Sequence, residues 1–314
     1  TVQKLLYMQC PVCGEHIISI NRSISLMNNI ILKGNNVFAY RDPACYYKDG
    51  VFYLFYTVAV KEDGYLYEYV GMSESKDLIN WGNQRILTPK NLEENYCSPG
   101  NVIKYNDEFR ICFSSYPIKD TYEKCWCGDE NARLYIMRTK DFITFSKPEP
   151  IMVKEGVELK DMGRMIDPFI LEDRIEEGKY WIFYKQDGIN ISYSYDMENW
   201  TYFGKIDGGE NVCVVDTDDG YLMLHSPETG FGIKVSDNLT DWIDKSTVFA
   251  KKTDWEWADG RITAAFAMKA PENIKHKYIM FFHGSKKDAI PETHGNASIA
   301  YLFTDDFETF DEYD

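Results

Sequence analysis

Three acidic residues occupy comparable places along a chain of 314 residues. Asp42 and Asp167 are each followed by proline, and Glu210 follows a pair of glycines. Each lies about ten positions or slightly more ahead of an aromatic-rich segment, so the three are candidates for one common site. Carboxylates gathered in one place repel one another, which raises the pKa of at least one of them. A protonated carboxyl beside an ionised one is the pair that acid–base cleavage of a glycosidic bond requires.

The aromatic-rich segment recurs and defines the elements that would hold these residues. Its copies are Phe52–Thr57, Phe109–Ser114, Tyr180–Lys185, Tyr221–Ser226 and Tyr278–His283. A turn precedes each copy. After each copy comes a further strand and then a motif of Asp or Asn, an apolar residue, two further residues and Trp or Phe, at 77–81, 141–145, 196–200, 238–242 and 306–310. Each unit therefore reads as a four-stranded antiparallel sheet.

Repeated sheets of this kind bury their faces by packing radially, so the sequence predicts an all-β, five-bladed β-propeller. A β-sandwich is the rival fold, but it needs no such repetition. We expect one domain over 1–314, with blades near 36–90, 91–152, 160–205, 206–248 and 253–314. Residues 1–35 lie outside the repeat and are expected to close the ring or to cap it.

Composition limits the partners of this fold. The formal net charge of -16 disfavours nucleic acid and anionic membrane surfaces, and a neutral oligosaccharide or small glycoside is compatible with it. No apolar run is long enough for a transmembrane span. No signal peptide is seen, so we expect a cytoplasmic protein whose eight cysteines are free thiols. Cys10-Pro-Val-Cys13-Gly resembles half of a zinc knuckle, for which Cys125 and Cys127 are the sole candidates for a second half.

In a propeller, the first strand of each blade lines the central channel, and its start lies near the mouth. The corresponding positions in the five blades are Asp42, Ser98, Asp167, Glu210 and a pair formed by Asp259 and Arg261. In the predicted chemistry one carboxylic acid protonates the leaving oxygen. An ionised carboxylate activates a water on the opposite face of the sugar, and the third carboxylate tunes the acid.

These residues resemble the five-bladed glycoside hydrolases of family 43, which comprise arabinofuranosidases, xylosidases and arabinanases. The segment Arg41-Asp-Pro-Ala resembles the one that carries the base of that family, and Ile166-Asp-Pro-Phe resembles the one that carries its pKa-modulating Asp. Glu210 stands where the family has its general acid. The resemblance implies base Asp42, modulator Asp167, acid Glu210 and inversion of the anomeric configuration, with a terminal arabinofuranosyl or xylosyl residue as substrate.

Families 32, 68, 117 and 130 share this fold and provide the alternatives. Families 32 and 68 retain configuration with the first Asp as nucleophile, but their Asn-Asp-Pro-Asn signature is Arg41-Asp-Pro-Ala here, and their Glu-Cys pair is Glu210-Asn. Phosphorylases of family 130 need basic residues for phosphate, which Arg41, Lys185 and Arg261 can supply. The family-43 acid segment usually reads Glu-Gly-Pro or Glu-Ala-Pro, so the altered context of Glu210 also leaves open a catalytically inactive sugar-binding propeller.

Further side chains are candidates for substrate binding. The six-residue segments end on Thr57, Ser114, Lys185, Ser226 and His283, which either ring the pocket as hydrogen-bond donors to substrate or are strand ends that meet solvent. Trp257 can stack on a sugar face, and Arg41 can hold a hydroxyl or pair with Asp42. His283 resembles a family-43 His near an axial calcium or water cluster, but no metal or cofactor is required by the expected chemistry.

Overall fold

The computed structural model describes residues 7–9, 16–18, 29–117, 130–249, 255–289 and 294–312, and the structural statements below refer to these residues. The four cysteines considered for zinc, at positions 10, 13, 125 and 127, lie outside the described residues. In the described part of the chain, no helix is both long and apolar enough to cross a membrane.

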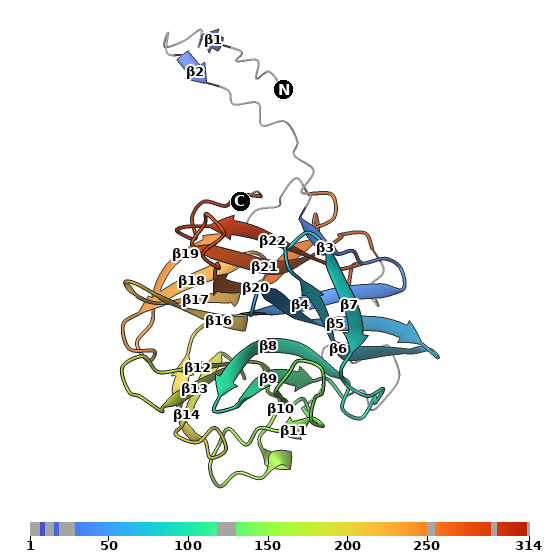
Figure 1. Ribbon diagram of the computed structural model, residues 1–314, viewed down its shortest axis with the longest axis vertical. Helices are drawn as coiled ribbons and strands as arrows, with labels where there is room; N and C mark the ends of the chain where they lie inside the picture. The colour runs from blue at the N-terminus through green and yellow to red at the C-terminus, as the bar shows by residue number, and fades with distance from the viewer. Residues whose placement is uncertain are drawn as a thin grey trace.

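Five four-stranded antiparallel sheets surround a central axis, which confirms the predicted five-bladed propeller (Figure 1). The first blade holds β4 (Phe38–Lys48), β5 (Val51–Glu62), β6 (Tyr65–Ser75) and β7 (Trp81–Ile86). The second holds β8 (Tyr96–Tyr105), β9 (Glu108–Ser115), β10 (Leu134–Thr139) and β11 (Glu149–Pro150). The third holds β12 (Ile166–Glu172), β13 (Tyr180–Lys185), β14 (Ile189–Ser194) and β15 (Thr201–Ile206). The fourth holds β16 (Glu210–Thr217), β17 (Gly220–Ser226), β18 (Phe231–Ser236) and β19 (Ile243–Val248).

The fifth blade closes the ring. It holds β20 (Arg261–Lys269), β21 (Tyr278–Ser285) and β22 (Ser298–Thr304), and its outer strand is β3 (Ile30–Leu32) from the other end of the chain. Ile299 pairs with Leu32 across this junction, and β20 contacts β4 to complete the circle. Elsewhere, β1 (Tyr7–Gln9) pairs with β2 (His16–Ile18), and one 3-10 helix covers Leu159–Asp161.

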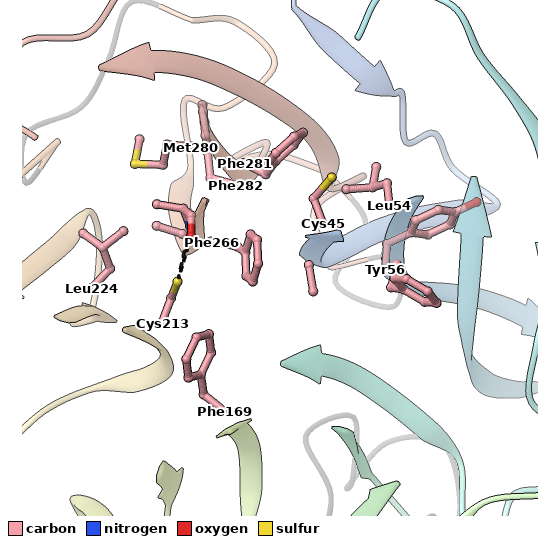
Figure 2. Close-up of a cluster of buried hydrophobic side chains, with 14 of the residues drawn as sticks. Cys45, Leu54, Tyr56, Phe169, Cys213, Leu224, Phe266, Met280, Phe281 and Phe282 are labelled. Carbon is pink, nitrogen blue, oxygen red and sulfur yellow. Dashed lines mark hydrogen bonds between the residues drawn. The ribbon is translucent and has the colours of Figure 1, made fainter. Parts of the chain in front are cut away.

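Each six-residue segment lies within the second strand of its blade, and most of its residues are buried. The inner strands fill the axis with apolar side chains. Figure 2 shows the rings of Phe169 and Phe266 pointing into the centre, with Cys213 beside them. The two ring centroids lie 6.5 Å apart. Because these side chains fill the axis next to the predicted catalytic residues, they close the floor of the candidate site.

At one end of each sheet, the recurring Asp or Asn motif builds the turn that follows the third strand, and in the first four blades this turn leads into the fourth strand. The apolar residue of each copy has a positive φ, namely Leu78 (63°), Phe142 (56°), Met197 (56°), Leu239 (67°) and Phe307 (59°). This conformation is unfavourable for a residue with a Cβ, so burial of these side chains must compensate. In the third blade, Asp196 Oδ1 accepts hydrogen bonds from the N–H groups of Glu198 and Asn199. The motif is therefore structural, and we call this end of the blades the turn end.

Candidate active site

The opposite end of each inner strand carries a bulge, and we call this end the axial end. The register shifts where β4, β8, β12, β16 and β20 pair with their second strands. Each bulge begins with a residue of positive φ: Asp42 (50°), Ser98 (46°), Asp167 (54°), Asn211 (53°) and Ala264 (54°). These five bulge residues line a cavity of about 20 Å³ on the axis, floored in part by Phe266.

In the fourth and fifth blades, the bulge residue is not the one that the sequence comparison predicted to be equivalent to Asp42. Asn211, and not Glu210, is the structural counterpart of Asp42 and Asp167, because Glu210 pairs with Ser226 as Arg41 pairs with Thr57. In the fifth blade the counterpart is Ala264, and Asp259 and Arg261 lie before it. The sequence held a signal for the fourth blade, since Asn211 precedes Tyr221 by the same ten positions that separate Asp42 from Phe52.

The strand-terminal side chains were predicted to donate hydrogen bonds to substrate, and in the structure they bond to the backbone. In four blades, the last residue of the six-residue segment accepts the N–H of the bulge residue on the next blade. The bonds run from Ser98 N to Thr57 Oγ1 (2.7 Å), from Asp167 N to Ser114 Oγ (2.8 Å), from Ala264 N to Ser226 Oγ (2.8 Å) and from Asp42 N to His283 Nδ1 (3.1 Å). We call these four side chains the acceptor ring. They fix the bulges, and therefore the carboxylates, from the neighbouring blade.

Asp42 is held firmly in this frame. Its side chain is 3% exposed. Its Oδ2 accepts hydrogen bonds from Thr57 Oγ1 (2.9 Å) and Ser98 Oγ (3.2 Å). His283 is buried, and burial together with Arg41 and Arg261 lowers its pKa well below the usual value, so the ring is neutral and Nδ1 is free to accept the Asp42 N–H. Ser98 and His283, both predicted to bind substrate, thus contact the predicted base.

Asp167 differs from Asp42 in what its oxygens contact. It is buried, its Oδ2 accepts a bond from Asn211 N (3.3 Å), and its Oδ1 has no hydrogen-bond partner among the described residues. Burial, followed by the nearby Glu210 and Asp42, raises the pKa of Asp167 to about 8. At neutral pH this carboxyl therefore holds a proton.

Glu210 lies at the open side of the site. Its Oε1 pairs with Arg261 Nη2 at 2.9 Å, and the two side chains are 33% and 38% exposed. Arg261 also donates from Nε to the carbonyl oxygen of Glu228. After burial, the charges of Glu210 and Asp42 are the largest causes of the raised pKa of Asp167, so both carboxyl groups lie near it. The three predicted carboxylates are thus brought together.

A fourth carboxylate near the site was missed at the sequence level. Glu68, in the third strand of the first blade, is 2% exposed, and burial followed by Asp42 raises its pKa to about 7, although Arg41 lowers it. Glu68 Oε1 lies 3.8 Å from Arg41 Nη1 and 3.5 Å from His294 Nε2. The available signal was a lone acidic residue inside the apolar run Tyr67-Glu-Tyr-Val70.

The remaining predicted substrate-binding residues lie in different surroundings. Trp257 packs against Trp255 and Phe282 in the core. Lys185 donates from Nζ to the carbonyl oxygen of Gly208 at 3.1 Å. Asp259 accepts the N–H of Lys287 in a surface loop. Among the described residues, no group of three or more His, Cys, Asp or Glu side chains has the arrangement of a metal site.

A five-bladed propeller that gathers acidic side chains at one end of its axis has the architecture of a glycosidase. A model of the glycosyl hydrolases family 32 N-terminal domain matches residues 40–219, a span that covers more than half of the chain and contains Asp42, Asp167 and Glu210. The chain belongs to this family, and it is a glycosidase by family and fold. No curated protein sequence matches the chain.

Solved glycoside hydrolases share the fold at low sequence identity. A thermostable family-43 glycoside hydrolase is 15% identical, with a TM-score of 0.60 over 89% of this chain and 95% of that one. A family 117 glycoside hydrolase of Zobellia galactanivorans is 13% identical, with a TM-score of 0.64 over 87% and 86% of the two chains. A member of family 130, described with mannoside phosphorylases and hydrolases, is 14% identical, with a TM-score of 0.59 over 95% and 89%. The predicted propeller superfamily is confirmed, and the matching family model is that of family 32, which the sequence motifs ranked second.

Proposed function

We propose that the protein hydrolyses a terminal arabinofuranosyl or xylosyl residue from an oligosaccharide, with inversion at the anomeric carbon. The observation that carries the proposal is the contrast between two neighbouring carboxyls. Asp167 has its pKa raised to about 8 and has one hydrogen-bond donor, whereas Asp42 accepts hydrogen bonds from two hydroxyl groups. A site that holds one proton among several carboxyls supports acid–base cleavage of a glycosidic bond.

In this scheme Asp42 is the base. It removes a proton from a water molecule whose oxygen attacks the anomeric carbon while the bond to the leaving oxygen breaks. His283 accepts the Asp42 N–H, and the hydroxyls of Thr57 and Ser98 donate to Asp42 Oδ2, so the carboxylate is oriented before substrate arrives.

The leaving oxygen receives its proton from the pair formed by Asp167 and Glu210. We assign delivery to Glu210, which is the more exposed of the two, and storage of the proton to the buried Asp167. Arg261 must then exchange its contact with Glu210 for a contact with substrate. These two roles suit a carboxyl whose pKa is close to neutral pH, namely Asp167, beside a more exposed carboxyl that can contact the ligand, namely Glu210.

The charges of the site support a neutral substrate. Arg41 is close to Asp42 and Glu68, Arg261 is paired with Glu210, and Lys185 donates to a backbone carbonyl. The three cations considered for phosphate therefore already contact protein acceptors. This favours hydrolysis by water over phosphorolysis.

A retaining β-fructofuranosidase-like hydrolysis is the second candidate, and the family-32 match over residues 40–219 favours it. In that reaction the Asp42 carboxylate attacks the anomeric carbon itself while the glycosidic bond breaks and Glu210 protonates the leaving oxygen. A water that gives its proton to Glu210 then hydrolyses the glycosyl-enzyme. The two schemes use the same residues, so they are separated by stereochemistry and not by mutation alone.

The test is turnover of aryl α-arabinofuranosides, aryl β-xylosides and β-fructofuranosides by wild type, Asp42→Asn and Glu210→Gln. Asn is chosen because it adopts positive φ readily and keeps the bulge. We expect turnover of an arabinofuranoside or xyloside that both variants lose, and proton NMR of the first product showing the inverted anomer. A retained anomer selects the second candidate. No turnover of any glycoside by a folded wild type contradicts both and leaves a sugar-binding propeller.

A further inference from the structure

One blade breaks the acceptor ring. The third blade ends its six-residue segment on Lys185, whose ammonium group has hydrogen-bond donors and no acceptor. Its Nζ donates to the carbonyl oxygen of Gly208, two residues before Glu210. The N–H of Asn211, which is the bulge residue of the fourth blade, therefore finds no partner at the position that serves the other four bulges.

The displaced N–H bonds to a carboxyl that the proposed mechanism uses. Asn211 N lies 3.3 Å from Asp167 Oδ2, and among the described residues this is the hydrogen bond that orients the Asp167 side chain, because Oδ1 has none. The bond joins the third blade to the fourth, in the same direction as every bond of the acceptor ring. A carboxyl of Asp167 thus occupies the place of the missing side-chain acceptor.

We propose that Lys185 is a positioning residue: by placing a side chain that cannot accept at the third blade, it directs the Asn211 N–H to Asp167 and holds this carboxyl toward the site. The inference rests on the proposed role of Asp167 in proton storage. It explains why four blades end on Thr, Ser or His while the blade that carries Asp167 ends on Lys.

The bond also has an electrostatic consequence. A backbone donor favours the ionised form of the carboxyl that accepts it, so the Asn211 N–H opposes the rise in the pKa of Asp167 that burial, Glu210 and Asp42 cause. Without this donor, the pKa of Asp167 would lie further above neutrality. The carboxyl would then exchange its proton less readily at physiological pH.

Two substitutions separate this role from a purely structural one. Lys185→Ser restores an acceptor of the kind found at Ser114 and Ser226, which bond the next bulge at 2.8 Å in each case. Lys185→Met removes the bond to Gly208 O and the charge but still offers no strong acceptor. If Lys185 merely ties down Gly208 or contacts substrate, the two variants will behave alike.

The first readout needs no turnover. The amide proton of Asn211, followed by NMR from pH 6 to 10, is expected to shift with the ionisation of Asp167 in wild type and in Lys185→Met. In Lys185→Ser it is expected to lose this titration, because its acceptor is then a hydroxyl. An Asn211 amide that titrates equally in all three proteins, or in none, overturns the proposal, whatever substrate the protein hydrolyses.

The second readout is the pH dependence of kcat/KM. We expect the alkaline limb of the kcat/KM profile to move to a pH higher by about half to one unit in Lys185→Ser. In Lys185→Met the limb is expected to lie at the same pH as in wild type. Equal shifts in both variants, or equal rises in KM with unchanged limbs, assign Lys185 a structural or substrate-binding role and overturn the inference. Absence of turnover in wild type is a failure of the proposed function alone, since the amide titration still decides the role of Lys185.

Discussion

Asp167 and Asp196 belong to the same blade and lie at its opposite ends. At the turn end, Asp196 is exposed and accepts two backbone N–H bonds and one from the Asn199 side chain, which lower its pKa below the usual range. At the axial end, Asp167 is buried with a single donor and two acidic neighbours, and its pKa rises to about 8. Aspartate therefore serves as an ionised turn-former at one end of the blade and as a protonated acid at the other. The number of hydrogen-bond donors and the access of water determine which form is favoured.

The largest effect expected from this comparison is on turnover. Asp42→Asn at the axial end removes the proposed base and is expected to lower kcat by about 10²- to 10⁴-fold. Asp196→Ala at the turn end is expected to leave kcat within about twofold of wild type, because it touches no residue of the site. Steady-state hydrolysis of the best aryl glycoside measures both. Comparable losses in the two variants would mean that the axial end has no special role.

The next effect is on the pH dependence of stability. The pKa of Asp167 is raised in the folded state, so its contribution is fully present below about pH 4 and is lost as the pH rises toward 8. Asp167→Asn lacks this loss. The free energy of unfolding of the variant is expected to rise relative to that of wild type by about 1 kcal/mol per pH unit across that window. Urea unfolding between pH 4 and 8 measures the gain, and parallel curves for the two proteins would contradict a buried protonated Asp167.

The next expected effect is the loss of stability caused by adding a side chain to a glycine at the axial end, and it is smaller than the pH effect. A Cβ on Gly100 would lie 1.4 Å from the carbonyl oxygen of Pro168, which follows Asp167. Gly100→Ala should therefore push the second and third blades apart and cost about 2 to 3 kcal/mol. Gly82→Ala, whose Cβ would meet no atom within 4 Å, is the matched control. Equal thermal midpoints for the two variants would show that the blades do not approach this closely.

The smallest effect is expected at the turn end. Asp196→Ala removes acceptors of exposed backbone N–H groups and should cost less than about 1 kcal/mol at pH 7. Since the folded pKa is lowered, this contribution is present above about pH 4 and disappears as the pH falls further. Thermal unfolding at pH 7 and pH 2.5 checks the sign. A penalty that grows at low pH would contradict it.

The five blades could be predicted from the sequence because the signals that define them are local. Six-residue apolar segments, Asp-Gly turns and the Asp motif each act within a few residues, so the five sheets and the positions of Asp42 and Asp167 were predictable. The fourth blade was placed one residue out of register, at Glu210 instead of Asn211, because the prediction followed the acidic side chain and not the ten-residue spacing that Asn211 shares with Asp42. The approach of Glu68 to Arg41 depends on a contact between side chains of different strands, which a strand pattern does not encode.

The most direct test of the account is the protonation state of Asp167. Carbon-13 NMR of protein labelled at the aspartate carboxyl carbons, with Asp167→Asn used to assign the signal, follows this group through pH. The account predicts a carboxyl that stays protonated at pH 7 and titrates near pH 8. A signal from Asp167 that titrates near pH 4, as that of an ordinary surface aspartate does, would contradict it.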